Sequence, residues 1–512
     1  MERVEAERSG TGQEPGTAAA KPCGPSRVSP PLSVPTVLLL LAVVTVAGGG
    51  ALVKHFHGTV YPIADGAAIL AVIALPPVGI GWRRSRTRGR SRLLLGRSPE
   101  QWTFFAVFVF FLALYGVTRF GPTPFYEPSV QAEAFLHGHS WVDAPGYMEQ
   151  VGPICNANLP IAKKLLPECD LARFHGHTFL VHPPLAAIVL MPIVALHGRV
   201  VAGADEYQPS VCAVLGAIEV ALAWRLLWLL GLSTSASLWL TAFFGVGTSL
   251  WYEATLGASW DFVLVTSVLP TLLALNEVFG QARPWVVGTF AALAALARND
   301  LVLAWPAYCL LLLVRGRRLR DVFGVVPGFV MAGVVYGVFN YSRYGTFFDQ
   351  SLRLWYRCCD GGGYFNPAFH RAIAGPFSLQ FLPTNLYTLF FLGWGFNSTA
   401  FPWIRAQGAG HALLLTSPAF VLTLRPSLKA AVPLLMWMAA VLTMSASLLV
   451  YASGFMQFGT RYYVQVFPFL LVLIALGVGA RRPLDQMSRI LIIASVLIVA
   501  FGVWQIHTLG FG

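Results

Sequence analysis

The sequence has few charged residues. Only 11% of its 512 residues are charged, whereas 56% are hydrophobic, and soluble globular domains carry about 25% charged residues. This composition excludes a soluble enzyme, a secreted binding module and a disordered regulator. Cysteine is also scarce, because seven cysteines without a Cys-x-x-Cys spacing exclude a disulfide scaffold and the usual zinc-binding pattern. The chain is therefore predicted to be a polytopic membrane protein.

The basic residues are concentrated in short loops between apolar runs, although the chain as a whole has a net charge of +12. The richest loop, residues 82–97, holds seven arginines, and three further basic loops follow at 315–320, 425–429 and 481–489. A loop of this kind is usually a solvated charged segment, and we expect no nucleic-acid partner. Because short loops rich in Lys and Arg stay on the cytoplasmic side, all four loops are predicted to share the cytoplasmic face.

Apolar runs separate these loops and predict the transmembrane spans. The predicted spans are 36–53, 61–81, 103–119, 209–231, 236–252, 259–277, 284–298, 300–314, 322–341, 409–424, 430–451, 464–480 and 488–507. Two further apolar runs, 180–197 and 385–400, are predicted not to cross, because an extra crossing would place the next basic loop outside. After its proline pair, the first of these runs is also shorter than the about 20 residues that a crossing requires.

The predicted topology divides the chain into four parts. Residues 1–35 are polar and are expected to form a disordered cytoplasmic tail. An N-terminal helix pair with its basic loop (36–99), a main transmembrane domain (100–480) and a C-terminal transmembrane helix (481–512) follow. The predicted fold is an all-α polytopic bundle of about 11–13 transmembrane helices. Two long loops, about 120–208 and 342–408, lie on the outer side and carry short interfacial helices.

The first outer loop contains a carboxylate at a predicted helix start. Pro128 suits a first helical turn and Gly138 suits a helix end, so the pattern predicts a short helix over 128–137. At that position Glu127 is held in its charged form by the unpaired N–H groups of the helix. It is either a simple cap or a reactive carboxylate, and Glu133 suits a solvated face.

Cysteine and histidine pairs follow in the same outer loop. Cys155 and Cys169 form a plausible disulfide if the loop faces an oxidising compartment. His175 and His177, with a nearby carboxylate, have a spacing that can bind a metal ion. Polar interfacial histidines are the commoner explanation, and the same holds for His182.

Several arginines lie on the predicted outer side, where positive charge is normally depleted. The second outer loop holds Arg343, followed by Arg353, Arg357 and Arg371, and Arg461 lies at the outer mouth of span 464–480. Anionic lipid headgroups or a phosphate group would account for such residues. Arg298 and Asp300 lie at another outer junction and are able to pair with each other. Ionisable residues at membrane depth are costly and often functional.

Four segments of the chain, in this order, resemble the membrane glycosyltransferases of the GT-C superfamily. They are FYEPSVQAEAFLHGHSWVD, HPPLAAIVLMPIVALHG, FNYSRYGTFFD and FGTRYY. The resemblance is to the bacterial branch with protein O-mannosyltransferases and aminoarabinose transferases, and to actinobacterial relatives of unassigned specificity. It covers roughly 100–480 and implies a GT-C-like bundle with long outer loops.

The resemblance implies transfer of a sugar from a polyprenyl-phosphate donor to an extracytoplasmic glycan, lipid or protein acceptor, with membrane lipids as further partners. It assigns Glu127 as the base. Arg461 and Arg343 are candidate ligands of the donor phosphate, and His182 is a weaker candidate for the donor site. Tyr126, Arg298 and Asp300 are possible supporting residues.

The chain departs from the resembled family in two places. Many relatives have a pair of acids where this chain has Tyr126-Glu127, and paired acids are what would hold a divalent ion. We therefore expect an inverting transfer with no cofactor and no metal, although a divalent metal remains an alternative. Relatives often have Thr-Arg-Pro where this chain has residues 297–300. If Glu127 is only a cap, Asp143 and Glu149 are the alternative bases.

Two other classes of function compete with the enzyme. A transporter or flippase of a lipid-linked substrate would suit a polytopic chain, but transporters usually contain internal repeats and broken helices near the midplane. We find no repeat, and the ionisable residues gather at one predicted surface. A non-catalytic scaffold for envelope assembly is the third possibility, because only one acid of the family's pair is retained.

Overall fold

The computed structural model describes residues 99–120, 126–142, 171–197, 207–358, 377–397, 401–450, 454 and 457–509. The predicted tail 1–35, the spans 36–53 and 61–81 and the basic loop 82–97 lie outside the described residues. The described part is mostly helical. Its only strands form two short antiparallel hairpins, one of β1 (Leu171–Phe174) with β2 (His177–Leu180), the other of β3 (Gly395–Phe396) with β4 (Ile404–Arg405).

Seven described segments are long and apolar enough to cross a membrane. They are α3 (Pro99–Val117), α7 (Tyr207–Leu229), α10 (Ser259–Phe279), α13 (Leu319–Val322) with η3 (Phe323–Val325) and α14 (Val326–Tyr344), α18 (Ala431–Leu449), η8 (Arg461–Val466) with α19 (Phe467–Val478), and α20 (Gln486–Leu509). The protein is therefore an all-α polytopic membrane protein, as predicted from its composition.

The remaining described helices are shorter. They are α4 (Glu127–Leu136), α6 (Leu185–His197), α8 (Thr234–Val246), α9 (Leu250–Leu256), α11 (Pro284–Ala297), η2 (Asn299–Ala304), α12 (Trp305–Val314), α15 (Ser351–Cys358), η6 (Leu379–Phe381), α16 (Leu382–Phe390), α17 (Leu413–Thr416) and η7 (Pro418–Leu424). Seven candidate spans are fewer than the sequence predicts for this part of the chain. The difference arises because the predicted spans 236–252, 284–298, 300–314 and 409–424 form short or broken helices.

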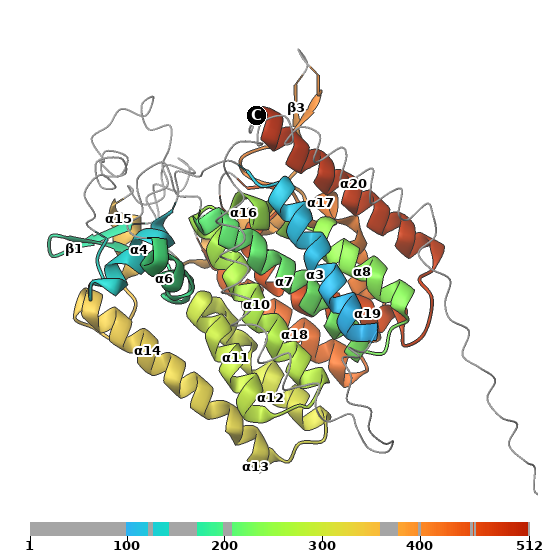
Figure 1. Ribbon diagram of the computed structural model, residues 1–512, viewed down its shortest axis with the longest axis horizontal. Helices are drawn as coiled ribbons and strands as arrows, with labels where there is room; N and C mark the ends of the chain where they lie inside the picture. Colours follow the sequence, from blue (N-terminus) through green and yellow to red (C-terminus); the bar gives the residue numbers. More distant parts are fainter. Residues whose placement is uncertain are drawn as a thin grey trace, which may run out of the picture.

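The two apolar runs that were predicted not to cross form short elements. Residues 180–197 contain α6, which has 13 residues and lies against α4 (Figure 1). Residues 385–400 contain the end of α16, which has nine residues, and strand β3. Neither element is among the seven candidate spans of the described residues.

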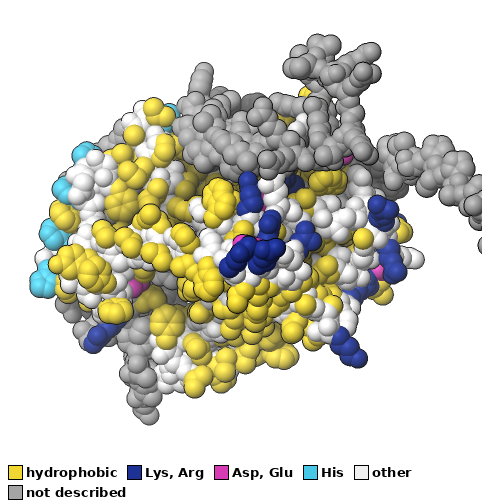
Figure 2. Space-filling model, turned by 90° about the horizontal axis from the view of Figure 1, so that it is seen from below, with side chains coloured by type: hydrophobic (Ala, Val, Ile, Leu, Met, Phe, Trp, Pro, Cys, Tyr) yellow, Lys and Arg dark blue, Asp and Glu magenta, His cyan; other side chains and the backbone are white. Residues whose placement is uncertain are grey.

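The described basic loops lie together at one end of the bundle. Arg315 donates a hydrogen bond from Nη2 to the carbonyl oxygen of Phe279, at 3.2 Å. The backbone N–H of Arg481 donates to the carbonyl oxygen of Gly231 at 3.0 Å, and Arg425 pairs with Asp485 at 2.5 Å. Figure 2 views the molecule from this side and shows Lys and Arg side chains gathered on it. In Figure 1 α13 lies at the bottom and the start of α20 at the right, whereas α4, α6 and α15 lie at the left and the C-terminal end of α20 lies at the top.

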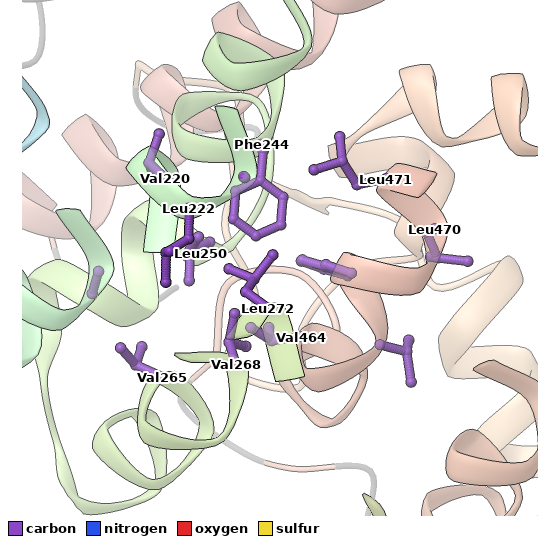
Figure 3. Packing of buried hydrophobic residues seen from close by; sticks show 14 of the residues in the cluster. Val220, Leu222, Phe244, Leu250, Val265, Val268, Leu272, Val464, Leu470 and Leu471 are labelled. Atoms are coloured by element: carbon purple, nitrogen blue, oxygen red, sulfur yellow. The ribbon is translucent and has the colours of Figure 1, made fainter. Parts of the chain in front are cut away.

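The core lies where α7, α8, α10 and α19 meet. Phe244 of α8, Leu272 of α10 and Leu471 of α19 are buried there, and Figure 3 shows them pointing toward one another. By contrast, α3 and α14 expose large apolar side chains such as Trp102 and Met331. Helices that are apolar on both their inner and outer faces are typical of a bundle surrounded by lipid.

Close packing of glycines holds α14 against α11. A Cβ atom added at Gly288 would lie 2.4 Å from the carbonyl oxygen of Val325, and one added at Gly328 would lie 2.6 Å from the carbonyl carbon of Gly288. Because lipid tails are as apolar as leucine, helix pairs in membranes depend on such backbone approach.

We therefore expect Gly288→Ala to lower the free energy of unfolding by about 3 kcal/mol, since the new methyl group meets backbone atoms that cannot move aside. Gly333→Ala on α14 is the matched control, because nothing lies within 4 Å of its added Cβ. Thermal unfolding in detergent measures both. Equal melting temperatures for the two variants would contradict the close packing of α11 and α14.

Candidate functional site

Glu127 is buried at the start of α4. Only 1% of the residue is exposed, and Pro128 follows it in the first turn of the helix, as predicted. The backbone N–H of Glu127 donates a hydrogen bond to Ser259 Oγ at 3.0 Å, and the Ser259 hydroxyl donates to Glu127 Oε2. The carboxylate is therefore held against the first residue of α10, inside the protein.

The first turn of α10 contacts both Glu127 and Arg461. Ser259 contacts Glu127, and the next residue, Trp260, lies under the guanidinium of Arg461, with Cζ 4.7 Å from the ring centroid. Arg461 is the first residue of η8 and is 5% exposed. Its backbone N–H donates to Gln457 Oε1 at 3.1 Å. Two of the predicted site residues, far apart in the sequence, therefore meet on successive residues of one helix.

A second pair of acids lies in the same place. Glu253 of α9 and Asp261 of the first turn of α10 are both fully buried. Their carboxyl groups lie within hydrogen-bonding reach of each other, and the guanidinium of Arg461 attracts both. The sequence shows that both residues flank a predicted outer turn, but it assigns them no role. Two acids in an otherwise apolar stretch are the signal that could have identified them.

Arg298 and Asp300 pair with each other, at 3.0 Å between Nη2 and Oδ2. Asp300 Oδ2 also accepts a hydrogen bond from Gln465 Nε2 at 2.9 Å. The ring of Tyr462 lies between the two arginines, with its centroid 5.6 Å from Cζ of Arg298 and 5.5 Å from Cζ of Arg461. The ring of Tyr462 therefore separates the predicted supporting pair, Arg298 and Asp300, from Arg461.

Arg343 is placed among other partners. Its side chain is fully buried and donates from Nη1 to the carbonyl oxygen of Leu180 at 2.6 Å and from Nη2 to Asn340 Oδ1 at 2.8 Å. Asp349 Oδ1 lies 3.8 Å from Nη2. These contacts join the end of α14 to strand β2. Arg343 therefore supports the shape of this end of the bundle.

The remaining predicted residues lie around α4 and α6. Tyr126 is buried directly before α4. His182 is half-buried between β2 and the proline pair that leads into α6. Among the described residues, no group of three or more His, Cys, Asp or Glu is placed to hold a metal ion. Cys155, Cys169, Asp143 and Glu149 lie outside the described residues.

His411 links two turns of the chain, one of which leads to Arg461. It is buried, and its ring Nε2 accepts a hydrogen bond from the backbone N–H of Gln407 at 3.2 Å. The backbone N–H of His411 donates to the Gly459 carbonyl oxygen at 3.2 Å. Burial lowers the pKa of His411 to about 4, and a backbone hydrogen bond with Arg405 opposes this shift. The ring is therefore neutral at neutral pH.

This lowered pKa predicts a loss of stability in acid. Between the ordinary histidine pKa of about 6.5 and the folded value, the unfolded chain binds the proton and the folded chain does not. The contribution of the neutral His411 ring to the free energy of unfolding is complete above pH 6.5 and is lost as the pH falls towards 4. At pH 5 the free energy of unfolding is lower by roughly 2 kcal/mol. Melting temperatures of wild type and His411→Gln from pH 7.5 to 5 measure this. Parallel pH profiles for the two proteins would contradict it.

When the chain is compared with known proteins, no family model, no curated protein and no solved structure matches it.

Proposed function

We propose that the protein is an integral membrane glycosyltransferase that moves a sugar from a polyprenyl-phosphate donor to an extracytoplasmic glycan, lipid or protein acceptor. The four segments that resemble the GT-C superfamily suggest this activity. The observation that carries the proposal is that a buried carboxylate, Glu127, contacts Ser259 while a buried guanidinium, Arg461, lies over the next residue, Trp260.

The two groups suit the two halves of the reaction. An acceptor hydroxyl is a poor nucleophile, so a carboxylate must take its proton as the new bond to the anomeric carbon forms. Ser259 donates a hydrogen bond to Glu127 Oε2, which orients the carboxylate for that task. The leaving phosphate gains negative charge, which Arg461 stabilises in a site shielded from water. A single displacement of this kind inverts the anomeric centre.

The position of the site in the bundle suits a lipid-linked donor. Helix α4, which begins with Glu127, lies at the other end of the bundle from α13, which follows the Arg315 loop (Figure 1). If that loop is cytoplasmic, as its charge favours, the site lies on the outer side. The surrounding apolar helices then place the lipid tail of the donor in the membrane next to the reacting phosphate.

A flippase of a lipid-linked substrate is the second candidate. Glu219 lies at the middle of α7 and is fully buried. Ionisable residues at this depth often mark a path through the membrane. The same substrate class would be moved, but no new glycosidic bond would form.

The proposal is tested with right-side-out membrane vesicles and a panel of short polyprenyl-phosphate sugars, each labelled in the sugar. We expect label to pass to an acceptor when the matching donor is supplied to the outer face, and not in vesicles that lack the protein. Label that stays on the lipid but crosses the membrane would favour the flippase. Transfer from the inner face alone would contradict the proposed orientation.

A further inference from the structure

The buried acids Glu253 and Asp261 form a pair that the proposed reaction does not use. All four of their carboxylate oxygens are buried and accept no hydrogen bond from another described side chain, although the backbone of Ala258 lies within hydrogen-bonding reach of Asp261. The two carboxyl groups also lie within hydrogen-bonding reach of each other. Two ionised carboxylates would repel each other strongly in such a place. The only hydrogen able to join them is a proton held by the pair itself, as in other carboxyl pairs.

The charge of this pair matches that of its neighbour. A pair that shares one proton carries one negative charge, and the buried guanidinium of Arg461, which attracts both carboxyl groups, carries one positive charge. With no ligand present the group is therefore neutral. An anion that contacts Arg461 adds a negative charge and draws on the same guanidinium, and a second proton on the pair would offset that added charge.

We propose that Glu253 and Asp261 form a proton-binding site that is coupled to Arg461. The pair takes up a proton when an anionic phosphodiester binds at Arg461. The inference rests on the proposed function, because the expected anion is the phosphodiester of the lipid-linked donor. Uptake of one proton keeps the buried group neutral when the ligand is bound. Affinity for the anion then rises as the pH falls, by at most about tenfold for each pH unit.

Other titratable groups face the pair from the elements packed against it. In the described ranges these are Cys212 of α7, which interacts with both acids, and Arg461 of η8, which attracts both. Tyr115 of α3 lies next to Cys212, and Glu127 of α4 contacts Ser259, two residues before Asp261. The Cys212 thiol donates to the backbone carbonyl oxygen of Glu253 at 3.5 Å and the Tyr115 hydroxyl donates to the Gly245 carbonyl oxygen at 2.7 Å. Both groups therefore donate to backbone carbonyl oxygens and not to the two carboxyl groups, whereas Arg461 acts on both carboxyl groups.

The test is isothermal titration of the full-length chain in detergent with farnesyl methyl phosphate, a phosphodiester whose own charge does not change between pH 6.5 and 8. Binding is measured in two buffers that differ in their enthalpy of ionisation, which gives the number of protons taken up for each anion bound. We expect about one proton for the wild type at pH 7. The double variant Glu253→Gln, Asp261→Asn is expected to take up none and to bind with no dependence on pH.

Glu219→Gln is the matched control, because it removes another fully buried carboxyl group of the same helix bundle and should leave proton uptake unchanged. Binding by the wild type without proton uptake would overturn this inference and leave the proposed function standing. No binding of the probe to the wild type would overturn both. If the double variant fails to fold, the wild-type proton count alone decides the question.

Discussion

Glu127→Gln is expected to slow sugar transfer by about a thousandfold, because general base catalysis contributes about 10²–10⁴ to such reactions. Glutamine has nearly the same shape, and its amide oxygen is able to accept the hydrogen bond that Ser259 donates to Oε2. It is not able to accept the proton of the acceptor hydroxyl. We therefore expect a large fall in kcat with an unchanged donor KM, measured with the donor that the vesicle panel identifies.

Glu133→Gln is the matched control for this prediction. Glu133 lies on the same short helix as Glu127 but is only half-buried, and it has no part in the proposed reaction. We expect this variant to keep wild-type activity. Near-normal transfer by Glu127→Gln, in a protein that elutes and melts like the wild type, would show that Glu127 is a structural residue at the start of α4.

Arg461→Gln is expected to lower kcat/KM for the lipid-linked donor by about a hundredfold or more and also to destabilise the protein. Removing one partner of a buried ionic group costs about 3–5 kcal/mol, since the other charge is left uncompensated. Here that charge belongs to Glu253 and Asp261. Arg461→Lys keeps the charge but loses the planar group that lies over Trp260, and we expect an intermediate loss.

Arg283→Gln separates the loss of donor binding from a general loss of stability. Arg283 pairs with Glu277 at 2.8 Å, in the turn between α10 and α11 at the end with the basic loops. Its substitution also removes an ion pair, but it should leave donor kinetics unchanged. A normal donor KM and kcat in Arg461→Gln, once melting temperatures are compared, would contradict the phosphate role of Arg461.

Several features of the fold were predictable from the sequence because they depend on local physics. Composition alone decides that the chain is a membrane protein, since no arrangement of so few charged residues covers a soluble core of this size. The proline at position 128 and the glycine at 138 mark a short helix that the structure shows as α4, within one residue at each end. The grouping of the described basic loops at one end was also predictable, because charge sets which turns share a face.

The meeting of distant residues depended on tertiary structure. Pairing of Glu253 with Asp261, and the stacking of Arg461 on Trp260, require α9, α10 and η8 to pack together, and no periodicity in the sequence encodes that contact. Arg343 illustrates the same limit, because the sequence groups it with Arg461 by charge, whereas packing gives it Leu180 and Asn340 as partners. Side chains far apart in the chain meet only after helices pack, so local pattern identifies candidate residues and the packed bundle decides which of them act together.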